Sequence, residues 1–89
     1  MKQYTEEDFT RVSLGTLGGI LGVHGALEGE GRDEFTQRVN EVLRDKGERL
    51  VPYGTPGRAV SALNSYLAKG VAIKGIFKTP EFYVIIKER

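Results

Sequence analysis

The chain contains no cysteine, a single histidine and three prolines among its 89 residues. Without cysteine, the protein has no disulfide framework, no thiolate nucleophile and no zinc site with cysteine ligands. The same absence favours an intracellular, cytoplasmic location. With 39% hydrophobic and 28% charged residues, the composition is that of an ordinary globular domain rather than a disordered chain. We therefore expect residues 1–89 to form a single domain with a marginal core.

The sequence also lacks the signals that direct a chain to a membrane or out of the cell. Its start, MKQYTEEDF, carries one lysine followed by three acidic residues, the reverse of the basic region that opens a secretory signal. Sixteen uncharged residues lie between Arg11 and Glu28, fewer than the ~20 apolar residues that span a bilayer. We therefore expect no membrane partner.

Catalytic groups are also scarce. The one histidine, His24, precedes Glu28 by four residues, so the two would share a helical face. That pair supplies two metal ligands, whereas a stable zinc site needs three or four, and a contact near a helix C-terminus is the simpler interpretation. The stretch GTLGG lacks the Lys-Ser/Thr ending of a phosphate-binding loop. We expect no enzyme, no catalytic residues, no metal and no cofactor.

The N-terminal third predicts one long helix over residues 6–27. Thr5 is its expected N-cap, with Asp8 near the capping-box position. Helical spacing places most of the apolar residues on one broad side, which we expect to face the core. That predicted core face consists of Phe9, Val12, Leu17, Ile20, Val23 and Leu27.

The rest of the chain is divided by clearer signals. A helix over 33–46 is predicted by Phe35, Val39, Val42 and Leu43, and it ends at Gly47. Residues 49–53, RLVPY, predict a short extended segment, which Pro52 limits to a sheet edge or a connection. A third helix over 56–69 begins after Thr55 and ends at Gly70. Two β-branched and aromatic runs, about 71–77 and 81–87, predict a hairpin.

This order of elements resembles that of winged-helix domains. The resemblance implies an α+β fold of three helices with a C-terminal β-hairpin, a recognition helix at 56–69 and a wing at 71–87. The connection from Gly47 to Pro56 is longer than the turn of a standard helix-turn-helix. A βαβ crossover from 49–53 through the third helix to 71–77 is the competing topology, giving a small αα-βαββ sheet with helices on one face.

Charge is divided unevenly along the chain. Residues 1–36 hold three basic and seven acidic residues, a net −4, whereas residues 37–89 hold ten basic and five acidic residues, a net +5. Such asymmetry indicates an anionic partner for the second half, often a nucleic acid. The alternative is that the two halves attract each other.

The third helix and the hairpin carry the candidate DNA contacts. Opposite its core side, the helix presents basic ends and short polar side chains, which fit a major groove without obstruction. The hairpin lysines fit phosphates. We expect a DNA-binding regulator whose partner is double-stranded DNA, although an ordinary solvated helix face and a lysine-protected edge explain the same residues. The predicted contacts are Arg58, Ser61, Ser65, Lys69, Lys74 and Lys78.

Glycines form a second candidate surface. In a helix over 6–27 they gather opposite the core side at small-xxx-small spacing, which lets a second backbone approach closely. They indicate a homodimer or a protein partner, and the alternative function is an adaptor or inhibitor that never contacts nucleic acid. A further alternative is that part of 14–25 is not helical. The predicted interface consists of Gly15, Gly18, Gly19, Gly22 and Gly25.

Overall fold

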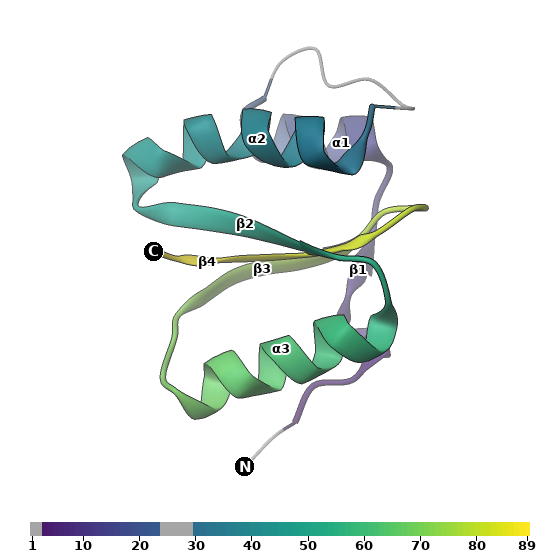
Figure 1. The fold of residues 1–89 in the computed structure, drawn as a ribbon, viewed down its shortest axis with the longest axis vertical. Helices are drawn as coiled ribbons and strands as arrows, with labels where there is room; N and C mark the ends of the chain where they lie inside the picture. Colours follow the sequence, from purple (N-terminus) through teal and green to yellow (C-terminus); the bar gives the residue numbers. More distant parts are fainter. Residues whose placement is uncertain (1–2, 24–29) are drawn as a thin grey trace.

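A four-stranded mixed sheet separates two layers of helices in the computed structural model, which describes residues 3–23 and 30–89 (Figure 1). The strands lie in the order β1-β3-β4-β2, with β1 and β3 parallel and the other pairs antiparallel. Helices α1 and α2 cover one face of the sheet, and α3 covers the other (Figure 1). The elements are the 3₁₀ turn η1 (Glu6–Asp8), β1 (Thr10–Arg11), α1 (Leu14–Ile20), α2 (Arg32–Leu43), the 3₁₀ turn η2 (Arg44–Lys46), β2 (Glu48–Tyr53), α3 (Pro56–Ala68), β3 (Ile73–Lys78) and β4 (Tyr83–Glu88).

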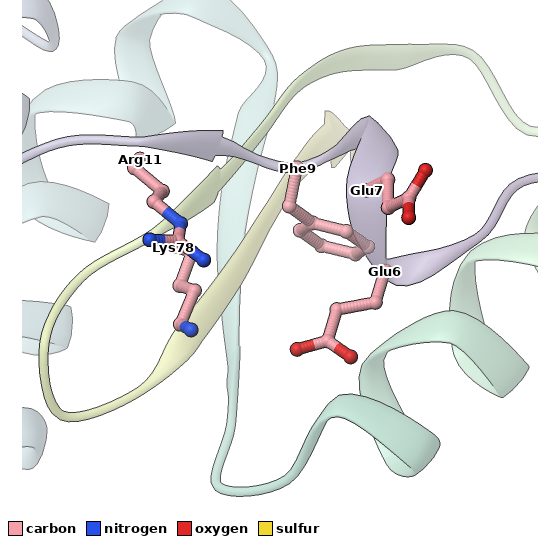
Figure 2. Close-up of a pocket in the computed structure, with 5 residues that line it drawn as sticks. All are labelled: Glu6, Glu7, Phe9, Arg11 and Lys78. Carbon is pink, nitrogen blue, oxygen red and sulfur yellow. The ribbon is translucent and has the colours of Figure 1, made fainter.

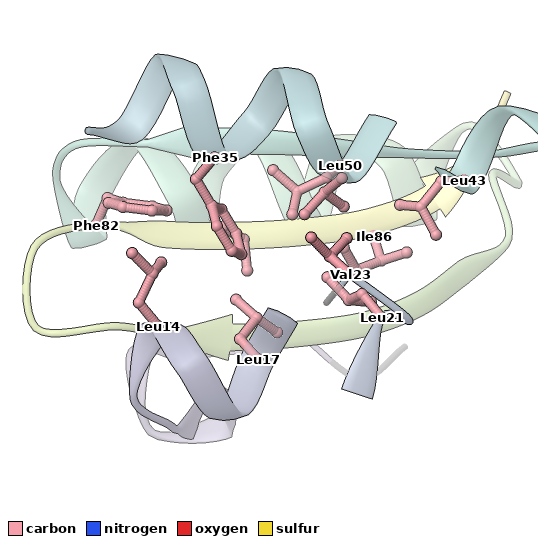
Figure 3. Close-up of a cluster of buried hydrophobic side chains, with 11 residues drawn as sticks. Leu14, Leu17, Leu21, Val23, Phe35, Leu43, Leu50, Phe82 and Ile86 are labelled. Atoms are coloured by element: carbon pink, nitrogen blue, oxygen red, sulfur yellow. The ribbon is translucent and has the colours of Figure 1, made fainter. Parts of the chain in front are cut away.

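Strand β4 is central and contributes to a core on each face. Side chains alternate along a strand, so Val84 and Ile86 face α1 and α2, whereas Tyr83 and Ile85 face α3. Figure 3 shows the core under α1 and α2. That core consists of Leu14, Leu17, Leu21, Val23, Phe35, Val39, Leu43, Leu50, Phe82, Val84 and Ile86, and the core under α3 consists of Phe9, Ala59, Leu63, Tyr83 and Ile85.

The predicted fold class is confirmed, since the described residues form three α-helices and a mixed sheet with the C-terminal hairpin. The winged-helix arrangement is not confirmed. A helix-turn-helix needs the second and third helices to pack together, whereas here the sheet lies between α2 and α3 (Figure 1). Strands β2 and β3 both run antiparallel to β4, so they are parallel to each other. Together with α3, which connects them, they form the βαβ crossover of the alternative topology, and β4 lies between them in the sheet.

The predicted winged-helix arrangement and the alternative αα-βαββ topology each differ from the structure in one respect. The hairpin strands β3 and β4 are the inner strands of the sheet, so the hairpin does not project as a wing. The alternative topology placed all helices on one face, but the long apolar run of β4 is buried on both faces and needs a helical layer on each.

The long helix predicted over 6–27 is wrong. Its first part forms η1 and β1, and Phe9 between them has extended backbone angles. Helix α1 begins only after Ser13, whose side chain accepts a hydrogen bond from the Thr16 N–H at 3.1 Å. It ends before Gly22, which has a φ of 81°, a left-handed conformation that glycine adopts without strain. The predicted residues 24–27 lie outside the described part of the chain.

The outer edge of β2 is closed by a side chain from α2. The Asn40 amide accepts the Leu50 N–H at 2.7 Å and donates to the Leu50 carbonyl at 3.2 Å, as a neighbouring strand would. Pro52, two residues on, has no N–H to offer on that side. The Glu48 carbonyl accepts a bond from the Arg89 side chain at 3.2 Å. These contacts protect an edge strand against pairing with another chain.

Candidate nucleic-acid interface

The outward face of α3 brings three of the predicted DNA contacts together. Thr55 caps the helix by accepting the Arg58 N–H at 3.3 Å, and Pro56 occupies its first turn. Arg58 is the only charged residue within α3, and it is exposed together with Ser61 and Ser65. These side chains line a shallow hollow of about 660 Å³, whose other lining residues are Tyr53, Gly57 and Ala62.

Two tyrosines lie where α3 meets β2. The hydroxyl groups of Tyr53 and Tyr66 are hydrogen-bonded at 3.0 Å. Burial, followed by that hydrogen bond, raises the pKa of Tyr53 well above its ordinary value, against the opposing influence of Arg49. Lys87 Nζ lies 5.2 Å from the centre of the Tyr66 ring. This flank of α3 therefore combines neutral hydroxyl groups with cations and has no carboxylate in its hollow.

Basic residues gather at the end of the sheet where β2 and β3 begin and β4 ends, which we call the basic end. Arg49 pairs with Lys87 in the strand register, and Lys87 also pairs with Ile73 at the start of β3. The turn into β2, the chain end and the connection from α3 to β3 all lie at this end (Figure 1). Its basic residues are Arg44, Lys46, Arg49, Lys69, Lys74, Lys87 and Arg89, against Asp45, Glu48 and Glu88.

The cations of the basic end have no ion-pair partner within the described residues. The ion pairs of the described chain are Arg32–Asp33 and Arg38–Glu30, both away from this end. The Glu88 carboxylate instead accepts the Ala72 N–H at 2.9 Å. The Arg38–Glu30 pair does join the two halves of the chain, but no direct ion pair from the first half reaches these cations in the described part.

The three predicted lysines fall in different places. Lys69 is the exposed C-cap of α3 and continues the line of Arg58, Ser61 and Ser65 toward the basic end. Lys74 is exposed at a register irregularity of β3, also at the basic end. Lys78 lies at the other end of β3, paired with Arg11 of β1. Lys78 is therefore not brought together with the helix contacts.

Sequence reasoning missed Arg49 and Lys87. Both lie on the sheet face that α3 covers, since Arg49 alternates with Leu50 of the opposite core and Lys87 contacts Tyr66. Because side chains alternate between the two faces of a strand, the sequence RLVPY could have shown that Arg49 lies on the face opposite Leu50. The pairing of Arg49 with Lys87 could not be read locally, because it depends on which strand lies beside β2.

The predicted glycine interface is divided by the fold. Gly18 is buried, Gly15 is partly buried and Gly19 is exposed. A Cβ placed on Gly22 would lie 3.8 Å from the Val42 side chain, so Gly22 approaches α2 of the same chain. Gly25, His24 and Glu28 lie outside the described residues.

Comparisons with protein-family models, with curated proteins and with solved structures find no match for this chain. Over residues 3–23 and 30–89, no group of three potential metal-ligating side chains is present. In the same ranges, no helix is long and apolar enough to cross a membrane.

Proposed function

We propose that this protein is a small regulatory protein that binds double-stranded DNA through α3 and the basic end. The observation that carries the proposal is the outward face of α3, which runs through Arg58, Ser61, Ser65 and Lys69 without a carboxylate and leads to the basic end. Helices that read DNA present such short polar and basic side chains to base edges and phosphates.

The position of α3 supports entry into a groove. Among the described residues, α3 shares its face of the sheet only with the N-terminal segment and its short turn η1, while α1 and α2 lie on the opposite face (Figure 1). Its apolar side is fixed by Ala59 and Leu63 in the core, so the polar side is held in one orientation. A rigid helix placed in this way needs no rearrangement of the domain before it contacts a major groove.

The basic end supports contacts to phosphates. Lys69, Lys74 and Arg49 are exposed there, and none of them has an ion-pair partner among the described residues. Binding to duplex DNA releases counterions in proportion to the phosphates that such cations neutralise. We assign Arg58, Ser61 and Ser65 to base edges, and Lys69, Lys74, Arg49 and Lys87 to phosphates.

The proposal is tested by the salt dependence of binding to a fluorescent duplex. The association constant of the wild-type protein should fall steeply between about 50 and 200 mM salt. Each of the substitutions Lys69→Gln and Lys74→Gln should reduce the log–log slope by about 0.9, because each removes one phosphate contact.

A matched control is Arg32→Gln, which removes the same charge at the start of α2, away from the basic end. The Arg32–Asp33 pair is solvent-exposed at 3.6 Å, so its loss should cost little stability. Equal slope changes in all three variants would indicate nonspecific attraction by net charge and contradict a defined contact surface. Absence of duplex binding at low salt would overturn the proposal.

A further inference from the structure

Two cationic side chains lie next to each other on the parallel strands β1 and β3. Arg11 is paired with Lys78 in the register of these strands, and both line the same hollow of about 410 Å³ (Figure 2). In this view the two side chains lie together, the Glu6 carboxylate extends toward them, and the Glu7 carboxylate points away. Like charges on directly paired strand positions repel each other and destabilise the folded state.

Two acidic side chains lie near this pair without bonding to it, because Glu6 and Glu7 line the same hollow. Neither Arg11 nor Lys78 forms an ion pair with a described residue. The Glu6 carboxylate keeps its negative charge and accepts a hydrogen bond from the Tyr83 hydroxyl at 2.5 Å. Lys78 Nζ lies 5.5 Å from the centre of the Tyr83 ring, which offsets part of its charge but leaves that of Arg11.

A second hollow, of about 430 Å³, lies beside the same two cations and has no acidic lining residue. The Thr79 hydroxyl lines it but already donates to the Phe82 carbonyl at 2.9 Å. The Ser13 hydroxyl likewise lines it and donates to Thr16 Oγ1 at 2.8 Å. Arg11 and Lys78 are therefore the groups through which this hollow would hold a ligand, and the ligand should be an anion. Its lining residues are Arg11, Val12, Ser13, Lys78, Thr79 and Pro80.

The surroundings favour a small anion over a polymer. Glu6 and Glu7 line the adjoining hollow, so a nucleic-acid backbone that extends past Arg11 would meet two carboxylates. A single phosphate group in the acid-free hollow would contact both cations without extending to Glu6 and Glu7. A guanidinium and an ammonium group suit a phosphate because both form charge-assisted hydrogen bonds to its oxygens.

We propose that Arg11 and Lys78 form a binding site for a small molecule that carries a phosphate group. The site lies at the β1 edge of the sheet, where Lys78 is separated from the basic end by the length of β3. It does not rest on the proposed binding of DNA.

The test uses inorganic phosphate as the probe, with chloride at equal ionic strength as the reference. In phosphate, NMR spectra of the wild-type protein should show saturable shifts at the Arg11 side chain and the Lys78 amide. The substitution Arg11→Gln should weaken the apparent phosphate affinity by about tenfold or more. In chloride it should raise the thermal midpoint, because it relieves the repulsion from Lys78.

The control is Arg32→Gln, which removes one exposed cation from the start of α2 and should leave the phosphate shifts unchanged. The rise of the midpoint in chloride also verifies that Arg11→Gln is folded. Equal shifts in chloride, or unchanged phosphate affinity in Arg11→Gln, would overturn the site. Shifts at Arg11 that occur with duplex DNA but not with phosphate would assign the cations to nucleic acid and overturn it as well.

Discussion

At the scale of single residues, Tyr83 connects the N-terminal segment to the central strand. Its hydroxyl donates to Glu6 of η1, and its ring meets Phe9 edge-on at 5.4 Å between ring centres. The hydrogen bond to Glu6, with a smaller contribution from burial, raises the pKa of Tyr83 above its ordinary value. These contacts stabilise the protonated hydroxyl, so the ionisation of Tyr83 is linked to folding.

The sign of this linkage predicts a loss of stability in alkaline solution. Above pH 10, the ordinary tyrosine value, the unfolded chain releases the Tyr83 proton while the folded chain retains it. The free energy of unfolding should therefore fall as pH rises through the folded-state pKa. Urea denaturation on either side of pH 10 should show a smaller fall for Tyr83→Phe than for the wild-type protein.

Tyr53 contributes to the fall in the same direction, because burial and its bond to Tyr66 raise its pKa too. Tyr83→Phe should therefore reduce the alkaline loss without abolishing it. The variant Glu6→Gln, which removes the carboxylate acceptor, should reduce it as well. An unchanged pH dependence in both variants would show that the Tyr83–Glu6 contact does not favour the neutral hydroxyl.

At the scale of elements, α1 shows why its glycines are not equivalent. Gly19 lies inside the helix, and no other part of the described fold comes within 4 Å of the position that a Cβ would take there. Gly22 follows the helix with a φ of 81°. The first position tolerates a side chain, and the second favours glycine for its backbone conformation. The glycine-rich stretch is therefore partly a helix-ending signal.

This difference predicts opposite effects of two alanine substitutions. Gly19→Ala should raise the free energy of unfolding by about 0.4–1 kcal/mol, because alanine restricts the unfolded chain and favours the helix. Gly22→Ala should lower it by about 1–2 kcal/mol, because alanine is strained at positive φ. Chemical denaturation measures both values. Destabilisation by Gly19→Ala similar to that by Gly22→Ala would instead favour a close helix contact at Gly19.

Local signals predicted α2, β2, α3 and the hairpin, but not the N-terminal region. The start of α3 is set by the Thr55 side chain, which caps the helix. The ends of η2 and α3 are followed by Gly47 and Gly70, which adopt positive φ, and these residue types can be recognised in the sequence itself. Strand β1 has two residues, and it forms because Thr10 pairs with Phe77 far along the chain. No periodicity within residues 6–27 contains that information, and apolar spacing alone favoured a continuous helix.

At the scale of the whole molecule, the uneven charge of the sequence becomes an uneven charge in space. The basic end combines residues from η2, β2, the C-cap of α3, β3, β4 and the end of the chain, which only the sheet topology brings together (Figure 1). The sequence predicted the cationic half and the α3 face. It could not predict that Arg49 and Lys87 lie at the basic end or that Lys78 lies away from it, because these positions depend on the order of the strands in the sheet.

DNA binding through α3 and the basic end is best tested by chemical-shift mapping of the labelled protein during titration with duplex DNA at low salt. We expect the largest amide shifts at Ser61, Ser65, Lys69 and Lys74, and none in α2 on the opposite face. These shifts should disappear as salt is raised, because counterion release drives the phosphate contacts. Shifts confined to α1 or α2, or none at any salt concentration, would show that this surface does not bind DNA.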